Sequence, residues 1–165
     1  MITNDNELRE MMVVAVKNAV NSTLEHFKNR LIEIIDESVY SNTPEWYTRT
    51  FEFRESWEIS KAELISTNTV EGYLYQNVPV MRWVAENFQH GNIYEPVTIQ
   101  SEHALNEILN KGTTNAGFGF PPVAATRFWD TFMDEVNRDV EVIFMKQLQS
   151  QGLEVTDARL SYSIS

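Results

Sequence analysis

Three histidines and a group of carboxylates are the side chains whose chemistry could support metal binding or acid–base catalysis. His103 and Glu107 are four residues apart, one turn of a helix, and so could supply half of a metal site. A zinc-binding H-E-x-x-H helix needs a second histidine and a third ligand, but His26 and His90 lie in unrelated segments. The spacing favours a solvated helix face over a metal centre.

Carboxylates are dense in a segment that is expected to be helical towards the C-terminal end. Paired acids can act as a general acid and base, or can hold a cation. Acids in the first half of a helix also stabilise it through the helix dipole, and a solvated face is the commoner reason for such a group. Its members are Asp130, Asp134, Glu135, Asp139 and Glu141.

The glycine-rich stretch GFGFPP at 117–122 does not have the spacing of a phosphate-binding loop. It lacks the Lys-Ser/Thr pair of a P-loop and the third glycine of a dinucleotide fingerprint, so we expect a loop with two aromatic anchors, Phe118 and Phe120. No serine lies in a G-x-S-x-G context, and the chain has no cysteine. We therefore expect no cofactor and no enzymatic activity.

The chain is strongly acidic, with 13 Lys and Arg against 24 Asp and Glu, a net charge of −11 over 165 residues. Affinity for nucleic acid depends largely on neutralising phosphates, so sequence-specific DNA binding is not favoured. The charge fits either plain solubility or a surface past which DNA slides without sticking. No apolar run reaches the roughly 18 residues that span a membrane, so we expect no membrane association.

A helix is predicted over 5–38, because apolar residues recur there at steps of three and four. Asn4 can cap its first turn. Such a helix is about 50 Å long at 1.5 Å per residue, whereas a compact domain of this size is roughly 30 Å across. Part of it should therefore project, bend or pack on a neighbouring subunit. The stripe is formed by Leu8, Met12, Val16, Val20, Leu24, Phe27, Leu31 and Ile35.

The middle of the chain, 46–78, is predicted to be a β-hairpin region. The alternation in YTRTFEFRESWEI at 47–59 predicts a strand whose odd-numbered face, with Phe51 at its centre, is buried. A hairpin is expected between 61–66 and 70–76. The elements that follow are a short helix at 101–111, a long helix at 125–150 and a strand at 153–164.

This order of elements predicts an α+β fold in a single domain over 1–165. A long N-terminal and a long C-terminal helix would pack on a small antiparallel sheet. The start of the last helix, RFWDTF, places Phe128 and Phe132 on its apolar stripe. Trp129 is offset by about 100° from Phe128, so it fits either core packing or an exposed interface position.

The order of motifs resembles the neck, or tail-completion, proteins of long-tailed bacteriophages, which join the head to the tail. Members show a helix, a segment of the type Y-x-R-T-G-x-L-x-x-S, a strand pair, a segment ending near Gly, and an aromatic entry into a last helix. Phe51 departs from this pattern, since Gly is common there. The matching residues are Tyr47, Arg49, Thr50, Phe53, Ser56, Phe88, His90, Gly91, Arg127, Phe128 and Trp129.

The resemblance implies a non-catalytic virion subunit that forms a hexameric or dodecameric ring, contacts neighbouring connector and tail proteins, and passes DNA without binding it specifically. It would be made in the bacterial host cytoplasm and reside in the virion neck. The alternatives are a tail terminator or minor tail protein, or a small acidic enzyme or ligand-binding domain. Candidate interface residues are Tyr47, Arg49, Phe118, Phe120, Arg127 and Trp129.

Acidic residues would line the channel of such a ring, since like charge keeps the duplex away from the wall. Either long helix can supply them, and the sequence does not choose between the two. The candidates are Glu7, Glu10, Glu25, Glu33, Asp36 and Glu37 on the first helix, and Asp134, Glu135, Asp139 and Glu141 on the last.

Overall fold

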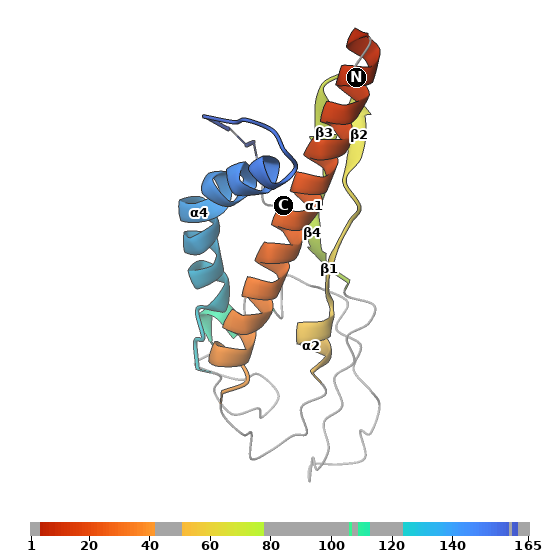
Figure 1. Cartoon of the computed structure of the whole chain (residues 1–165). Helices are drawn as coiled ribbons and strands as arrows, with labels where there is room; N and C mark the ends of the chain where they lie inside the picture. The colour runs from red at the N-terminus through yellow and green to blue at the C-terminus, as the bar shows by residue number, and fades with distance from the viewer. Residues whose placement is uncertain are drawn as a thin grey trace. The chain divides into compact units, whose positions relative to one another are not determined.

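The computed structural model describes residues 4–41, 51–77, 106, 109–112, 124–158 and 160–161. A long N-terminal helix, a long C-terminal helix and two small two-stranded sheets give the predicted α+β fold (Figure 1). The chain divides into two compact units. The first comprises Met1–Asn29, Ile59–Leu74 and Asp134–Ser165, and the second comprises Arg30–Glu58 and Tyr75–Met133.

The helix α1 spans Asp5–Ser38, the range expected from its sequence. Its first turn is capped as predicted, because the backbone N–H of Glu7 donates to Oδ1 of Asn4 at 2.9 Å. The predicted stripe is buried only in part: Phe27, Leu31 and Ile35 are buried, whereas all residues from 4 to 12 are exposed. The N-terminal end of α1 therefore carries apolar residues that no described part of the chain covers.

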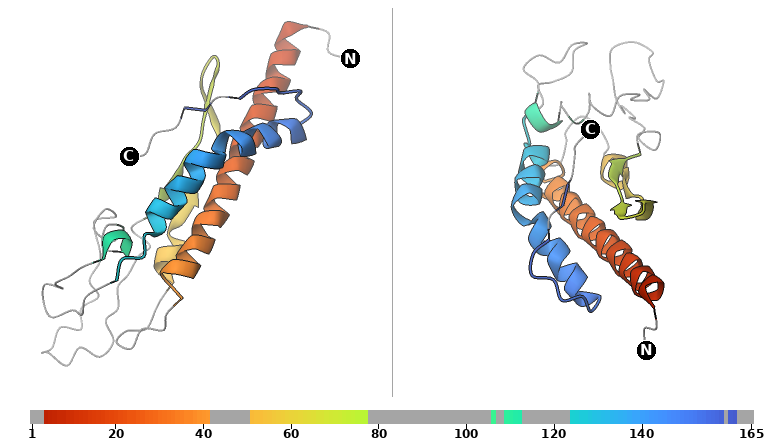
Figure 2. Two further views of the ribbon diagram at one scale, coloured as in Figure 1. Left: turned by 90° about the vertical axis from the view of Figure 1, so that its left-hand side faces the viewer. Right: turned by 90° about the horizontal axis from the view of Figure 1, so that it is seen from above.

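In the first unit, a hairpin lies along the N-terminal part of α1 (Figures 1 and 2). Strands β2 (Glu63–Ser66) and β3 (Thr69–Glu71) pair antiparallel, with Glu63 opposite Glu71 and an irregularity between Leu64 and Ser66. Two polar contacts fix the hairpin to the helix. Arg9 donates to the carbonyl of Thr67 at 2.6 Å, and the N–H of Ala62 donates to Asn21 at 2.8 Å.

The hairpin approaches α1 closely at Gly72. A Cβ atom added there would lie 2.8 Å from Cδ1 of Leu24 and 3.2 Å from Cγ1 of Val20. These distances are shorter than ordinary van der Waals contact, so the absence of a side chain at Gly72 permits the packing of hairpin on helix.

The core of the first unit is formed by α1, the C-terminal part of α4 (Phe128–Ser150) and the segment that follows it. Ala19, Phe144 and Leu148 are its buried members. Partly buried side chains cover them: Val16, Val20, Leu153, Val155, Ala158 and Leu160. The prediction of a strand at 153–164 is wrong for the residues described there, 153–158 and 160–161, which pack on helices without forming a strand.

The end of α4 has the hydrogen bonds of a Schellman motif around Gly152, which has a φ of 82°. The N–H of Gly152 donates to the carbonyl of Gln149 at 3.0 Å, and that of Leu153 donates to Leu148 at 3.3 Å. Leu153 also packs against the cluster that contains Leu148. Gly152 therefore ends the helix.

The second unit corrects the prediction of a strand over 47–59. Among the residues described there, 51–59, Glu52–Glu55 form one helical turn, α2, and only Trp57–Ile59 form a strand, β1, which pairs with β4 (Leu74–Gln76). Phe51 is 43% exposed and has a φ of 60°, in the left-handed region. The expected burial of Phe51 is therefore wrong, whereas Phe53 and Trp57 on the same predicted face are buried, together with Ser56.

Aromatic side chains form the core of the second unit. The rings of Phe53 and Phe128 meet edge-on, with centroids 5.4 Å apart. Trp129 stacks on Trp57 at 5.6 Å with an interplanar angle of 18°, and it also contacts Phe132 at 5.4 Å. Such pairs each add about 0.5–1.5 kcal/mol beyond the burial of their area. The start of α4 is therefore anchored by its own predicted apolar stripe.

Candidate functional site

The start of α4 brings together the two candidate interface residues that the structure describes, Arg127 and Trp129. Arg127 precedes the helix with a φ of 53°, so α4 begins three residues later than expected. Its side chain is 72% exposed. Trp129 is half-buried against Trp57, so core packing accounts for one face of its ring.

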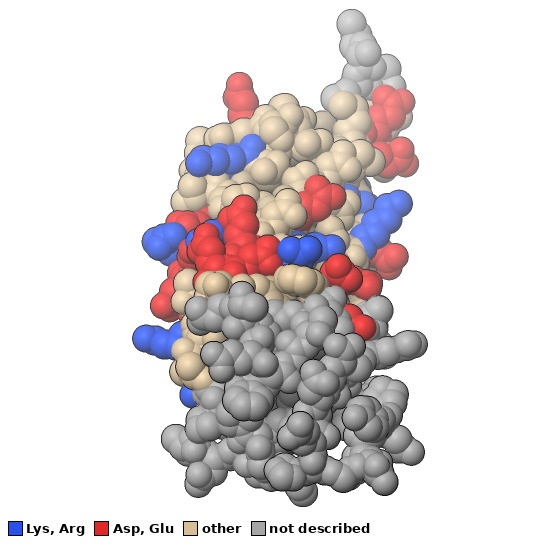
Figure 3. Space-filling model, turned by 90° about the horizontal axis from the view of Figure 1, so that it is seen from below, with Lys and Arg blue, Asp and Glu red and all other residues tan. Residues whose placement is uncertain are grey.

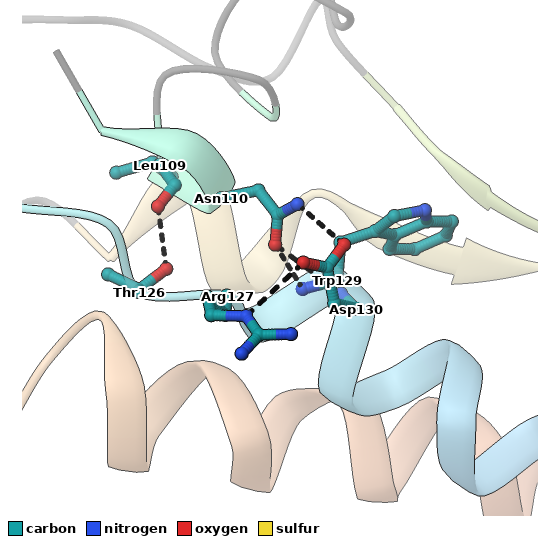
Figure 4. Close-up of polar contacts among 6 residues, drawn as sticks. All are labelled: Leu109, Asn110, Thr126, Arg127, Trp129 and Asp130. Atoms are coloured by element: carbon teal, nitrogen blue, oxygen red, sulfur yellow. Dashed lines mark hydrogen bonds and ion pairs between the residues drawn. The ribbon is translucent and has the colours of Figure 1, made fainter.

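The helix has an unusual cap that is supplied from outside α4 (Figure 4). Asn110, which is helical and 8% exposed, accepts hydrogen bonds through Oδ1 from the backbone N–H groups of Trp129, at 3.1 Å, and Asp130, at 3.3 Å. Its Nδ2 donates to Oδ1 of Asp130 at 2.9 Å. Arg127 stands at the capping position and has no acceptor in its side chain, so Asn110 takes over that role.

Two backbone hydrogen bonds hold the capping residue in place. The N–H of Arg127 donates to the carbonyl of Asn110 at 3.1 Å, and the N–H of Thr126 donates to the carbonyl of Leu109 at 3.0 Å. The hydroxyl of Thr126 donates to the same carbonyl at 2.7 Å (Figure 4). Residues 109–110 and 126–130 thus form one hydrogen-bonded node.

The charge at this node is concentrated on Asp130. The hydrogen bond from Asn110 lowers the pKa of Asp130 below its ordinary value, and Arg127 and Lys111 lower it further by hydrogen bonding and charge. Arg127 Nε lies 3.5 Å from Oδ2 of Asp130. The geometry serves to start and orient α4, and it leaves the exposed Arg127 guanidinium at the surface.

The acids of α1 do not form one set. Glu7, Glu10 and Glu25 are exposed in the first unit, whereas the other three belong to the second. There, Glu33 accepts from Arg30 at 2.8 Å and Asp36 pairs with Arg54 at 3.2 Å; Glu37 is exposed.

The acids of α4 are closer together, and all four lie in the first unit: Asp134, Glu135, Asp139 and Glu141. Arg138 lies among them and donates to Asp139 at 2.7 and 3.0 Å. That hydrogen bond lowers the pKa of Asp139, with smaller contributions from the charges of Arg138, His26 and Lys146. The described residues in Figure 3 likewise show acidic and basic side chains interspersed on one face.

Several candidates lie outside the described residues: Tyr47, Arg49, Phe118, Phe120, and the histidines His90 and His103. Within the ranges that the structure describes, no group of three or more His, Cys, Asp or Glu residues is placed to hold a metal ion. Among the same residues, no helix is both long and apolar enough to cross a membrane.

Sequence reasoning did not identify two features of the surface. Asn110 carries no local capping signal, because the amides that it binds lie 19 and 20 residues further along the chain. At the N-terminal end of α1, Leu8 and Met12 belong to the predicted apolar stripe and are 43% and 48% exposed, and Met11, outside that stripe, is 58% exposed. The helical repeat predicts that such a stripe packs against another apolar surface, but it does not identify that surface.

Comparison of the chain with protein-family models, with curated proteins and with solved structures yields no match.

Proposed function

We propose that this protein is a non-catalytic structural subunit of a bacteriophage head-to-tail connector, which forms a ring that joins the portal-side adaptor to the tail and lets DNA pass. The resemblance of its motif order to neck proteins suggests this role. The observation that carries the proposal is the apolar stripe at the N-terminal end of α1. Leu8, Met11 and Met12 all remain exposed there.

An uncovered stripe of this kind favours a protein that completes its packing by assembly. Fully burying a Leu or Met side chain stabilises by about 1.5–3 kcal/mol, so three half-exposed side chains leave a few kcal/mol unused in the isolated chain. Exposed apolar side chains that cluster are characteristic of interaction sites, whereas scattered ones are ordinary. A connector subunit has neighbours that would use such a surface.

The acids of α4 support the proposed DNA channel more than those of α1 do. Four acids and one arginine, which pairs with Asp139, fall within residues 134–141, whereas the six acids of α1 are divided between the two units. We therefore assign the channel wall to Asp134, Glu135, Asp139 and Glu141. Virion localisation and contacts with tail proteins belong to the same proposal.

Mass photometry and negative-stain imaging of the purified protein test the ring. We expect a closed particle of six or twelve copies with a central hole. A monomer at every concentration would contradict the proposed function.

A second experiment tests the channel wall. In assembled rings, Asp134→Lys with Glu135→Lys should introduce binding of a short DNA duplex that weakens as salt rises, because counterions are released. Glu25→Lys, an exposed change on α1, is the control and should leave DNA binding absent. Equal gains in both variants would remove the assignment of the channel to α4.

A further inference from the structure

The apolar stripe at the N-terminal end of α1 is continuous with a face of the helix that already binds another helix. Leu8, Met12 and Val16 follow one another at steps of four, and Ala19 follows three residues later. At Ala19 and Val16 the stripe packs against Phe144 and Leu148 of α4. Beyond this contact, towards the N-terminus, α1 extends past the hairpin and α4 (Figure 2).

The chemistry around this stripe is acidic. Asp5, Glu7 and Glu10 are exposed on the same turns of α1. Arg9 is the one basic residue among 5–12, and its guanidinium donates to the carbonyl of Thr67 in the hairpin turn. At 100° per residue, Asp5 and Glu7 lie nearest Leu8, Met11 and Met12, whereas Glu10 lies on the opposite side of the helix. The end of α1 thus combines an apolar stripe with an excess of negative charge, which is complementary to an apolar surface flanked by Lys or Arg.

The same charge argues against a second copy of this chain as the occupant. A symmetric contact between two α1 ends would bring like charges together, which is costly at an interface. Two other exposed apolar side chains in the described ranges follow acids in the sequence: Leu64 follows Glu63 and Val142 follows Glu141. Val14 and Ile65 have no acidic neighbour in the sequence, and the ring of Phe51 lies 5.5 Å from the guanidinium carbon of Arg54.

Two exposed tyrosines fit this description as well. Tyr75 donates to Glu58 at 3.0 Å, and a hydrogen bond with Glu71 raises the pKa of Tyr73. An anionic membrane surface is disfavoured for the same electrostatic reason.

We propose that the N-terminal stripe of α1 is the docking site for an amphipathic helix of a different protein, whose apolar face is flanked by Lys and Arg. The helix would extend the packing that α4 makes on the same face of α1, with apolar anchors at steps of three and four. This inference builds on the proposed function, because it gives the chemistry of one neighbour in the connector.

The probe is a fluorescent peptide of about 18 residues, five helical turns, with leucines on one face and lysines at its margins. A matched peptide carries glutamates in place of the lysines. We expect the lysine peptide to bind the wild-type chain, with fluorescence anisotropy as the readout, and the glutamate peptide to bind at least tenfold more weakly. Equal binding of the two peptides would overturn the charge argument.

Variants locate the site. Met12→Glu should weaken binding of the lysine peptide by about tenfold or more, while Val142→Glu, a matched change at an exposed position on α4, should not affect it. The pair Asp5→Lys and Glu7→Lys, at the acids nearest the stripe, should reverse the preference towards the glutamate peptide. Because these side chains are exposed, none of the changes should unfold the protein. Loss of binding with Val142→Glu but not with Met12→Glu would place the site elsewhere and overturn the inference.

Ring formation is measured for every variant, which separates the two proposals. Intact rings with lost peptide binding in Met12→Glu support the inference. Loss of the ring in Met12→Glu would show that the stripe contacts a second copy, which overturns the inference and leaves the proposed function standing. A wild-type protein that stays monomeric and still binds the lysine peptide would contradict the proposed function and support the inference. Binding to vesicles of phosphatidylcholine and phosphatidylglycerol that Met12→Glu abolishes would make the stripe a lipid contact and overturn the inference.

Discussion

Replacing Asn110 by alanine should destabilise the protein, because one side chain makes all three hydrogen bonds that cap α4. The change leaves the N–H groups of Trp129 and Asp130 without their acceptor, and Asp130 without its donor. Loss of a helix cap costs about 0.5–2 kcal/mol, and leaving a buried donor unpaired costs about 1–3 kcal/mol. Because Asp130 is partly exposed and water can replace some of these contacts, we expect about 2 kcal/mol in total.

Urea denaturation followed by far-UV circular dichroism measures this change in the free energy of unfolding. Near-UV circular dichroism of the Trp57–Trp129 stack reports the same region locally. Asn29→Ala, an exposed change in the middle of α1, is the control and should alter stability by less than about 0.5 kcal/mol.

Exchanging the side chains of Asn110 and Asp130 tests whether the hydrogen bond between them contributes to stability. Asn110→Asp alone would place two carboxylates side by side, and it should be more harmful at neutral pH than in acid. Combined with Asp130→Asn, it restores one donor and one acceptor, so the double variant should be more stable than Asn110→Asp alone. A harmless Asn110→Ala, or a double variant no better than the single one, would refute the capping role.

Three further predictions concern the rest of the fold. Phe53→Ala should cost about 3–5 kcal/mol because the ring is buried, whereas Phe51→Ala should cost less than about 1 kcal/mol; similar losses in chemical denaturation would contradict this. Gly72→Ala should lower the free energy of unfolding by about 1–3 kcal/mol because the new methyl group crowds α1, and Gly152→Ala by about 1 kcal/mol because its backbone is left-handed. Thermal denaturation measures both losses. A crystal structure should show α1 displaced from the hairpin in Gly72→Ala but not in Gly152→Ala. Asp139 has a lowered pKa, so its contribution to stability is present above the pKa of about 4 in the unfolded chain and is lost as pH falls through the lower folded value. Asp139→Asn should therefore make the free energy of unfolding less dependent on pH in the acid range. An unchanged pH dependence would count against the Arg138 contact.

The long helices and the hairpin could be predicted because each carries a regular apolar pattern. α1 has the expected bounds, and α4 buries Phe128 and Phe132 of its predicted stripe. The hairpin was expected between 61–66 and 70–76, and the structure forms it with a two-residue turn at Thr67 and Asn68. The second predicted strand is divided, because β3 pairs with β2 and β4 pairs with β1. These are local signals, and tertiary packing reinforces them.

The segment at 51–59 could not be predicted from alternation, because its pattern fits two structures. Phe51, Phe53 and Trp57 share a face of a strand, but Phe53 and Trp57 are also one helical turn apart. Packing of Phe53 on Phe128 decides between them, and this contact joins residues far apart in the sequence. The prediction of a strand after Gly152 was wrong for a related reason, since the apolar residues of this segment pack on α1 and α4.

The candidate site was only partly accessible to sequence reasoning. The aromatic entry into α4 was identified, but its cap was not, since Asn110 lies in a different element. The length of α1 predicts that part of it projects, bends or packs on a neighbouring subunit, but its sequence does not show that the first turns are the exposed part. A helical repeat gives the direction of an apolar face and leaves its partner unspecified.

The cap on α4 has a consequence for how this protein can be recombined. A chimera that took α4 from residue 124 onward would leave behind the side chain that starts the helix, and its first turn should fray. The smallest exchangeable block instead begins at Leu109, and within it the side chain at position 127 does not have to cap α4. Substitutions at position 127 can change the surface charge of the molecule while α4 still begins at the same residue.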